Sequence, residues 1–240
     1  MKNRSFIFTA VVASLLCVSC TKPQTTLSEN ERPFNPPIMG WSSWNAFLVD
    51  ISEDIIKHQA DLMVEKGLKD AGYQYINVDD GYFGKRDENG VMQANEKRFP
   101  NGMKPVADHI HSLGMKAGLY TDAGTRTCGS LWNKDSIGIG AGIYGHEPQD
   151  AQLYFGDWGF DFIKIDYCGG EVLGLDEKER YTSIRNSIDK VNKNVSINIC
   201  RWAYPGTWAK DAATSWRISG DINAHWNSLK YVVGKNLYLS

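Results

Sequence analysis

The stretch FDFIKIDYCGG, from Phe160 to Gly170, contains the clearest hydrophobic pattern in the chain. Its phenylalanine and isoleucine side chains supply bulk on both faces, which is typical of a buried strand in a parallel sheet, and the glycine pair is expected to end it. Lys164 and Asp166 are two residues apart, so they point to the same side of this strand. Because unpaired charges are costly to bury, we expect both at the carboxyl end of the strand, where α/β barrels carry their active sites.

Strand-like and helix-like patterns alternate along the rest of the chain. Apolar runs that finish on polar side chains predict further strands at residues 39–45, 73–81, 116–122, 195–200 and 215–221. Helical spacing of apolar residues predicts helices at residues 51–66, 106–113, 147–158, 181–191 and 208–213. This alternation favours a (β/α)₈ TIM barrel over an open sheet. We therefore predict an α/β fold that holds about the first six units of a barrel, with the last two units beyond residue 240.

The first 19 residues have the pattern of an export signal. Positive charges precede an apolar run from residue 6 to residue 18, which is too short to remain as a membrane-spanning helix. The pair Ser19-Cys20 is similar to a lipoprotein cleavage site, at which Cys20 would become the lipidated first residue. We expect an exported bacterial lipoprotein of the outer membrane or periplasm, held at the membrane only by its lipid. The alternative is cleavage near Ser19 and release as a soluble periplasmic or secreted protein.

Two further segments follow the predicted signal. Residues 20–35 are polar, contain several prolines and lack periodicity, which indicates a flexible tether. Residues 36–240 are expected to form the partial barrel. The chain is 42% hydrophobic and 22% charged with a formal net charge of −2, so its charge balance gives no indication of a nucleic-acid partner. Its eight tryptophans include candidates for stacking on sugar rings, although most aromatic side chains are expected in the core.

Asp166 and Asp221 are the two carboxylates that we pair. Each ends a predicted strand of the same sheet and has a cation nearby, Lys164 for the first and Arg217 for the second. Retaining glycosidases need such a pair about 5–5.5 Å apart, one as nucleophile and one as acid/base. Lys164 is expected to keep Asp166 ionised, as a nucleophile requires. A structural salt bridge is an equally good interpretation of the Lys164 strand taken alone.

Other polar residues complete the candidate chemistry. Asp79 and Asp80 follow another strand and point to opposite sides, so one of them should face the site and accept hydrogen bonds from hydroxyl groups. His109 and His111 are two apart on a predicted helix and cannot chelate one ion, so no metal site is predicted. The glycine pattern at residues 140–145 fits a dinucleotide fingerprint, but no predicted strand precedes it, and a tight loop is the better interpretation.

Three cysteines lie in the predicted folded part. Cys128 and Cys168 each follow a predicted strand and could meet across adjacent loops, and an exported domain can keep such a disulfide. Cys200, at the end of its own predicted strand, is expected to be a buried thiol.

Five motifs carry a resemblance to a known family. They are MGWSSWN at residues 39–45, VDDGY at 78–82, GLYTDAG at 118–124, KIDYC at 164–168 and WRISGDI at 216–222. In order and spacing they resemble the α-galactosidases and α-N-acetylgalactosaminidases of glycoside hydrolase family 27. The resemblance implies a retaining enzyme that releases terminal α-D-galactosyl residues from a carbohydrate substrate by double displacement, without a cofactor.

The resemblance also implies roles for individual residues. Asp166 is the nucleophile and Asp221 the acid/base, and Cys128 is bonded to Cys168 as in the family disulfide. The residues that fall on sugar-contacting positions are Trp44, Asp79, Asp80, Tyr120, Lys164 and Arg217.

Two departures from the family pattern bear on the substrate. The family's α-galactosidases usually read Cys-Glu-Trp where this chain reads Cys200-Arg201-Trp202. We expect Arg201 to contact the substrate and to shift specificity, with pairing of Arg201 to a neighbouring acid as the alternative. The loop between Cys128 and His146 is longer than in typical α-galactosidases and is similar to that of isomaltodextranases.

Several activities therefore remain open at this stage. The alternatives within the family are an isomaltodextranase-like α-glucan hydrolase, a β-L-arabinopyranosidase and an α-N-acetylgalactosaminidase. A surface lipoprotein that binds glycans without cleaving them is a further alternative. The presence of both Asp166 and Asp221 argues against it, since a binding protein has no need of two opposed carboxylates.

Overall fold

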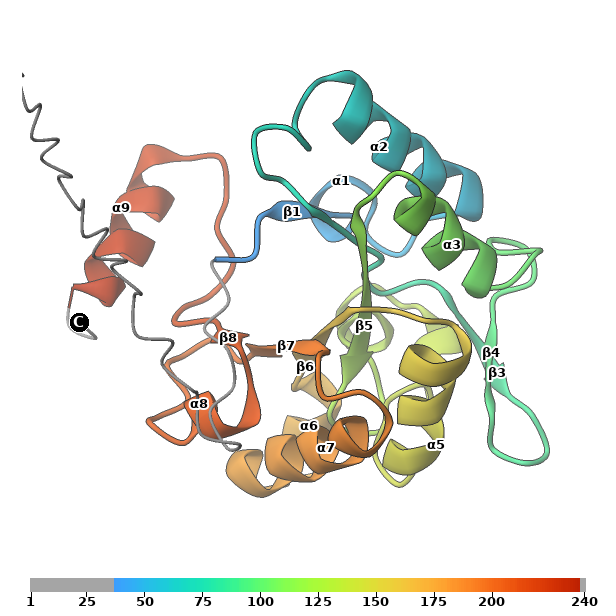
Figure 1. Ribbon diagram of the computed structural model, residues 1–240. Helices are drawn as coiled ribbons and strands as arrows, with labels where there is room; N and C mark the ends of the chain where they lie inside the picture. Colours follow the sequence, from blue (N-terminus) through green and yellow to red (C-terminus); the bar gives the residue numbers. More distant parts are fainter. Residues whose placement is uncertain (1–36, 238–240) are drawn as a thin grey trace, which may run out of the picture. The chain divides into compact units, whose positions relative to one another are not determined.

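The computed structural model describes residues 37–237 (Figure 1). The predicted signal at residues 1–19 lies outside the described residues, together with its apolar run. The expected lipidation site Cys20 and the predicted tether at residues 20–35 also lie outside them. Within the described range, none of the helices has the length and apolar character needed to cross a bilayer.

One parallel sheet forms the centre of the described chain, and its strands are paired in chain order. The strands are β1 (Gly40–Ser42), β2 (Tyr75–Asn77), β5 (Lys116–Asp122), β6 (Phe162–Asp166), β7 (Ser196–Cys200) and β8 (Ser215–Trp216). Strand order follows chain order in a β/α barrel, whereas a doubly wound sheet reverses direction at a switch point. The predicted fold, the first six strands of a (β/α)₈ barrel, is therefore confirmed.

Helices alternate with these strands and lie beside the sheet (Figure 1). The predicted helices are found as α2 (Glu53–Glu65), α3 (Lys104–Ser112), α5 (Glu147–Ala151) with its π-helical continuation η2 (Gln152–Asp157), α7 (Glu177–Val191) and α8 (Ala209–Ala212). Elements that the sequence pattern did not predict are α1 (Trp44–Phe47), the antiparallel strands β3 (Phe83–Arg86) and β4 (Met92–Ala94), α4 (Cys128–Trp132), the 3₁₀ helix η1 (Ser136–Gly138), α6 (Cys168–Val172) and α9 (Trp226–Asn236).

Local sequence explains where the two longest helices begin. The Ser52 side chain accepts a hydrogen bond from the amide of Ile55 at the start of α2, and Asp176 accepts one from the amide of Glu179 at the start of α7. Each cap satisfies a backbone donor that the helix leaves free, which is worth about 1 kcal/mol.

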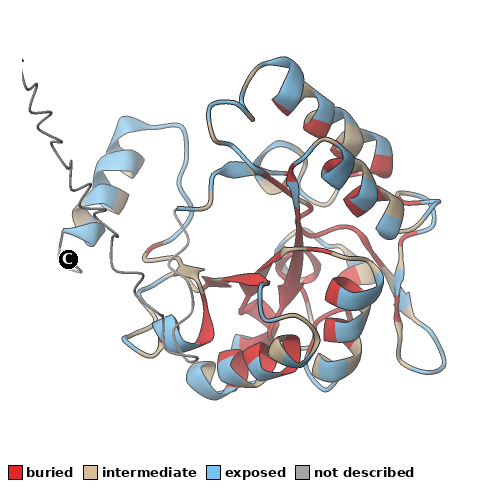
Figure 2. Cartoon of the chain, in the orientation of Figure 1, coloured by how far each residue is buried: buried red, intermediate tan, exposed pale blue. Residues whose placement is uncertain are grey.

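The core lies along the central strands, where Figure 2 shows the most continuous burial. Ile163 and Ile165 of β6 have no exposed surface, and Ile197 and Ile199 of β7 are at most 1% exposed. Burying such a side chain stabilises the fold by roughly 1.5–3 kcal/mol. The predicted central strand is therefore confirmed as the buried centre of the sheet.

The end of β6 differs from the prediction in one respect. The strand ends at Asp166, and the glycine pair lies within α6. A Cβ atom on Gly169 would lie 2.4 Å from the carbonyl oxygen of Arg126, and one on Gly124 would lie 2.1 Å from the backbone of Gly169. The glycines thus permit close packing of the loops that follow β5 and β6, and they do not act as a strand stop.

The last strand is shorter than predicted. β8 covers only Ser215 and Trp216, and Asp221 lies five positions beyond its end. β8 pairs with β7 on one side and is the last strand of the described sheet, so it has one hydrogen-bonding neighbour where the central strands have two. The expectation that Asp221 ends a strand is therefore wrong.

The glycine-rich segment at residues 140–145 forms a tight loop, as predicted. The amide of Gly140 donates to the carbonyl of Thr125 (2.8 Å), and the amide of Tyr144 donates to that of Gly124 (3.1 Å). The element before the segment is the short helix η1 rather than the strand that a dinucleotide fingerprint requires.

Candidate active site

A cleft of about 470 Å³ lies at the carboxyl ends of the central strands. Its described lining consists of Trp44, Leu48, Cys128, Trp132, Asn133, Lys164, Asp166, Cys168, Trp202, Arg217 and Asp221. Both predicted catalytic carboxylates are therefore in one cleft, together with three of the predicted sugar-contacting residues, Trp44, Lys164 and Arg217. Both half-cystines are in its wall.

Lys164 lies between two carboxylates. Its Nζ is 3.0 Å and 3.3 Å from the two oxygens of Asp79 and 3.6 Å from Oδ2 of Asp166, and it lies 5.2 Å from the centre of the Tyr120 ring. Burial favours the neutral amine, but the charges of Asp79 and Asp166 outweigh it and raise the pKa of Lys164 further above its usual value. The lysine therefore supplies a fixed positive charge beside Asp166.

Asp166 is 5% exposed, and burial raises the pKa of its carboxyl above the ordinary value. Lys164 and Arg217 act in the opposite direction without cancelling the effect of burial. Lys164 thus favours the ionised form of Asp166, as predicted, but its effect on the pKa is smaller than that of burial. Oδ1 of Asp166 is buried and has no hydrogen-bond partner among residues 37–237.

Cys200 lies beside Asp166 in the sheet and is a free, buried thiol, as predicted. Its Sγ accepts a hydrogen bond of 3.6 Å from Nη1 of Arg217. Burial and the charge of Asp166 raise the pKa of the Cys200 thiol well above its usual range, so the thiol stays protonated at neutral pH.

Asp221 has a different environment from Asp166. Its side chain is 70% exposed, and its Oδ1 lies 2.5 Å from Nη1 of Arg217. The same guanidinium therefore reaches both Asp221 and Cys200, and Cys200 is the residue paired with Asp166 in the sheet. Arg217 therefore contacts Asp221 directly and contacts Cys200, the sheet neighbour of Asp166.

The two neighbouring carboxylates after β2 have separate roles. Asp79 faces Lys164, whereas Oδ2 of Asp80 accepts a hydrogen bond of 2.8 Å from the amide of Gly129. The two side chains therefore have different partners, and the prediction that only one of them faces a bound sugar stays a prediction. Asp79, Asp80 and Tyr120 lie outside the described lining of the cleft, although Asp79 and Tyr120 contact the lining residues Lys164 and Cys128. Their direct contact with a sugar stays a prediction.

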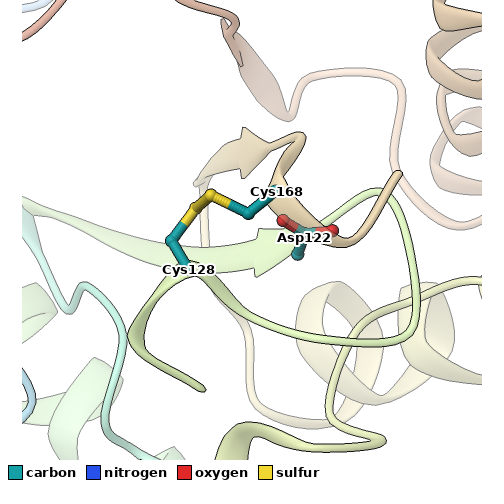
Figure 3. A group of neighbouring side chains, drawn as sticks. All are labelled: Asp122, Cys128 and Cys168. Atoms are coloured by element: carbon teal, nitrogen blue, oxygen red, sulfur yellow. A yellow bond between two sulfur atoms is a disulfide. The ribbon is translucent and has the colours of Figure 1, made fainter. Parts of the chain in front are cut away.

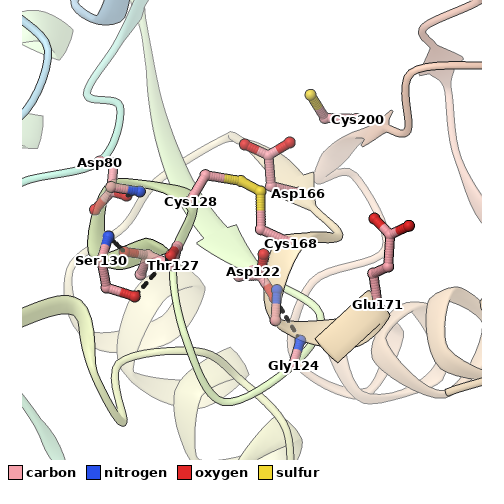
Figure 4. The surroundings of a disulfide bond; sticks show 12 residues. Asp80, Asp122, Gly124, Thr127, Cys128, Ser130, Asp166, Cys168, Glu171 and Cys200 are labelled. Carbon is pink, nitrogen blue, oxygen red and sulfur yellow. Dashed lines mark hydrogen bonds between the residues drawn. A yellow bond between two sulfur atoms is a disulfide. The ribbon is translucent and has the colours of Figure 1, made fainter. Parts of the chain in front are cut away.

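The predicted disulfide between Cys128 and Cys168 is present, with a Cα–Cα distance of 5.2 Å (Figure 4). A buried carboxylate holds the backbone next to each half-cystine. Asp80 accepts from the amide of Gly129, and Asp122 accepts from that of Gly169 at 3.0 Å. The disulfide and the two carboxylates therefore fix the cleft wall beside Asp166.

Burial raises the pKa of Asp80 and of Asp122 to about 7 in each case, against the lowering effect of these amide hydrogen bonds. Asp122 also accepts a hydrogen bond of 2.7 Å from the amide of Gly124. Sequence reasoning did not single out Asp122, although it ends a predicted strand and lies within one of the five motifs.

Asp122 and the two half-cystines form a cluster with the spacing of metal ligands. One oxygen of Asp122 and the two sulfurs lie within 4.8 Å of one another (Figure 3). Metals bind thiolates, and both sulfurs here are bonded to each other, so the oxidised cluster does not fit an ion. We assign it to the support of the cleft wall.

Arg201 is paired with two neighbouring acids. Its Nε lies 2.6 Å from Oε1 of Glu177, and its Nη1 lies 3.4 Å from Oε2 of Glu171. Arg201 is not among the described residues that line the cleft. Its guanidinium lies 5.4 Å from the ring of Trp202, which does line the cleft. Pairing with neighbouring acids, the alternative to substrate contact, is thus what the structure shows, and contact of Arg201 with a substrate stays a prediction.

Sequence reasoning missed four residues of the lining, namely Leu48, Trp132, Asn133 and Trp202. Trp132 carried a signal, because it is a large aromatic residue followed directly by the polar residues 133–136. Trp202 lies two residues beyond the end of a predicted strand, where barrels place functional side chains. Leu48 and Asn133 lie in turns that the hydrophobic pattern does not define.

The chain is similar to known proteins in both sequence and structure. The family model for alpha galactosidase A, Melibiase_2, matches residues 36–237. "Alpha-galactosidase A" of Cellvibrio japonicus (strain Ueda107) is 39% identical over 229 residues, which cover 95% of this chain and 53% of that protein. "Alpha-galactosidase" of Cyamopsis tetragonoloba is 42% identical over 206 residues, which cover 85% and 47%. The chain thus spans about half the length of the curated relatives that it matches.

Solved structures agree with these sequence relatives. The crystal structure of alpha-galactosidase I from Mortierella vinacea matches with a TM-score of 0.70 and 34% identity over 82% of this chain and 48% of that one. The alpha-galactosidase MEL1 from Saccharomyces cerevisiae matches with a TM-score of 0.69 and 36% identity over 79% and 41%. The fold, the carboxylate pair and these relatives lead to one conclusion: the chain belongs to the alpha galactosidase A family, glycoside hydrolase family 27.

Proposed function

We propose that the full-length protein hydrolyses terminal α-D-galactosyl bonds with retention of anomeric configuration. The observation that carries the proposal is that Asp166 and Asp221 line one cleft in a member of this family. Retaining glycosidases act with a carboxyl group on each side of the scissile bond. A carbohydrate substrate is also supported by a 35% identical alpha-galactosidase from Saccharomyces cerevisiae whose structure was solved with raffinose.

Asp166 supplies the nucleophile in this proposal. Its buried Oδ1 has no hydrogen-bond partner within the described chain, so its lone pairs are available to the anomeric carbon of a bound sugar. The bond from Oδ1 to that carbon forms as the bond from the carbon to the leaving oxygen breaks, which gives a covalent galactosyl-enzyme. Lys164 beside Oδ2 favours the ionised form that attacks.

Asp221 supplies the acid and then the base. It donates a proton to the leaving oxygen in the first step, and in the second it removes a proton from the water that attacks the anomeric carbon. The carboxylate left after the first step is the base of the second, and the proton that it takes from water restores the acid form. Arg217 holds the carboxyl group at the cleft through its guanidinium. Neither step requires a metal ion or an organic cofactor.

Trp44 and Lys164 are the lining residues that we assign to the sugar in the cleft, one by its apolar ring and the other by its charge. Asp79, Asp80 and Tyr120 are proposed to complete this site once substrate is bound, because each contacts a residue of its wall. The β-L-arabinopyranosidase neighbour at 24% identity shares the fold and gives no support for that specificity.

The stereochemical outcome tests the proposal. Proton NMR of the full-length protein acting on melibiose should show α-galactose as the first product, before mutarotation produces the β-anomer. First appearance of β-galactose would contradict the assignment of Asp166 as a nucleophile. Absence of hydrolysis of every α-galactoside offered would overturn the proposed activity itself.

We also propose that the protein is exported and lipidated at Cys20. Support comes from the charged start, the short apolar run and the Ser19-Cys20 pair. Expression of the full-length gene in a Gram-negative host should give a membrane-associated protein whose amino-terminal peptide carries acyl chains by mass spectrometry. A Cys20→Ser variant should be released from the membrane fraction, and equal membrane association of both proteins would contradict lipidation.

A further inference from the structure

Trp132 occupies a position in the cleft that the proposed reaction leaves unused. It ends α4 and lines the same cleft as Asp166 and Asp221, yet 75% of its surface is exposed. Leu48, also in the lining, is 45% exposed and has a left-handed backbone with φ of 50°. Exposed apolar side chains that line the same cleft as a pair of carboxylates are candidates for contact with a ligand.

The backbone that carries Trp132 is fixed from several directions. The disulfide ties Cys128 to Cys168, the Tyr120 hydroxyl accepts from the amide of Cys128 (3.2 Å), and Asp80 accepts from that of Gly129 (2.8 Å). Two further amides, those of Asn133 and Asp135, donate to the carbonyl of Gly129. A side chain on such a fixed backbone loses little conformational freedom when a ligand covers it, which favours binding.

The position of Trp132 relative to the carboxylates indicates which part of a substrate it meets. Asp166 is 5% exposed and marks the closed end of the cleft, where the anomeric carbon must lie. Asp221, which protonates the leaving oxygen in the proposed mechanism, has a 70% exposed side chain. Trp132 is the most exposed large apolar residue of the described lining, so it lies on the open side with the leaving group.

We infer that Trp132, with Asn133 beside it, forms the subsite for the sugar unit that leaves. The apolar C–H face of a pyranose packs against an indole ring, and the carboxamide of Asn133 can donate to and accept from neighbouring hydroxyl groups. The inference rests on the proposed function, since it deepens the same site. The ligand class is an oligosaccharide whose terminal galactose is linked to at least one further pyranose.

Two substrates separate this subsite from the chemistry. Melibiose leaves a glucose unit, whereas α-D-galactosyl fluoride leaves only fluoride and has nothing to place on Trp132. With the full-length protein, Trp132→Ala should lower kcat/KM for melibiose by about tenfold or more, as loss of an aromatic contact does. The same variant should keep kcat/KM for the fluoride within about twofold. Trp132→Phe should recover part of the loss on melibiose.

Trp226 provides a matched control, because it is 69% exposed on α9 and is not among the described cleft residues. Trp226→Ala should leave both substrates unchanged. Equal losses on melibiose and fluoride in Trp132→Ala, or no loss on either, would overturn the subsite. Wild-type protein that hydrolyses neither substrate would instead overturn the proposed function, so the two failures are distinguishable.

Discussion

The buried and exposed sides of the cleft differ in how the protein holds its carboxylates. Asp166 ends a strand that is paired over five residues with β5 and over five with β7, and it is 5% exposed. Asp221 follows the two-residue strand β8 and has a 70% exposed side chain that is held by Arg217. The sheet fixes the first carboxylate, and a local ion pair holds the second.

This difference matches what each carboxylate must do in the proposed reaction. A nucleophile gains from a rigid, dry position, because attack requires an oxygen at a defined point and little surrounding water. An acid/base must lie within reach of both the leaving oxygen and the attacking water, and Arg217 holds the Asp221 carboxyl group at the cleft. Within the described chain, the paired central strands position Asp166, and the ion pair with Arg217 positions Asp221.

Asp166→Asn is expected to have the largest effect. The amide keeps the shape of the side chain but cannot form the covalent intermediate, so kcat should fall by roughly 10⁴-fold or more on every substrate. Steady-state assays of the full-length protein on melibiose and α-galactosyl fluoride would measure this. Because the amide is uncharged, the variant should still melt cooperatively. A residual rate above about one hundredth of wild type would contradict the role of Asp166.

Asp221→Asn should have a smaller and substrate-dependent effect. General acid catalysis contributes about 10²–10⁴-fold, and the need for it depends on the leaving group. We expect a loss of that size in kcat/KM for melibiose and a much smaller one for the release of fluoride, which needs little protonation. Added azide should replace the lost base in the second step and yield a galactosyl azide detectable by mass spectrometry. Equal losses on the two substrates would remove the distinction between the two carboxylates.

The fold could be predicted well where burial is deepest. β5, β6 and β7 were predicted within two residues at each end of the observed strands, because their apolar runs fill both faces of a covered sheet. β8 was predicted over seven residues and has two, because the apolar pattern continues beyond the residues that pair with β7. The short helices α4 and α6 begin at the two half-cystines, and their loops are set by close packing of glycine backbones rather than by periodicity.

The candidate site shows a similar division. Asp166, Lys164 and Arg217 could be identified because they lie on or directly after strands that periodicity predicts. The position of Arg201 could not be predicted, because it depends on Glu177 and Glu171, which come from a different β/α unit. Trp132 was missed for a related reason, since its loop is placed by the disulfide and by Asp80, and these contacts join residues far apart in the sequence.

The buried wall of the cleft should show a pH dependence that the exposed side lacks. Burial raises the pKa of Asp80 from its ordinary value of 3.8 to about 7, and the nearby carboxylates Asp79 and Asp135 add to the rise. Between these two pH values the folded protein keeps a proton that the unfolded chain has lost. The contribution of Asp80 to stability is therefore fully present below about pH 4 and is lost as pH rises through about 7.

Asp80→Asn tests this dependence, because the carboxamide can still accept from the Gly129 amide but does not ionise. At pH 8 the variant should be more stable than the parent by about 1–3 kcal/mol, and the difference should narrow toward pH 4. Denaturant titrations at both pH values would measure it. Asp108→Asn, at a carboxylate that is 56% exposed, is the matched control and should change stability little. A variant that is destabilised equally at both pH values would contradict the buried titration.

Arg201 should have the smallest effect of the residues considered for the site. Its guanidinium is held by Glu177 at 2.6 Å and by Glu171 at 3.4 Å, outside the described lining of the cleft. Because the Arg201 side chain is 24% exposed and that of Glu177 is 31% exposed, the pair is worth no more than about 1 kcal/mol. Arg201→Gln should therefore change kcat/KM by no more than about threefold.

The pattern of the Arg201→Gln effect is as informative as its size. The guanidinium lies 5.4 Å from the rings of Trp202 and Tyr167, so an effect passed on through the cleft wall should be similar for all substrates. A panel of α-galactosides, α-glucans and β-L-arabinopyranosides should keep the rank order of the parent. Glu177→Gln breaks the same ion pair from the other side and should reproduce the result. A change of rank in Arg201→Gln that Glu177→Gln does not share would show that the arginine reaches the substrate after all, and that specificity is set on the exposed side of the cleft.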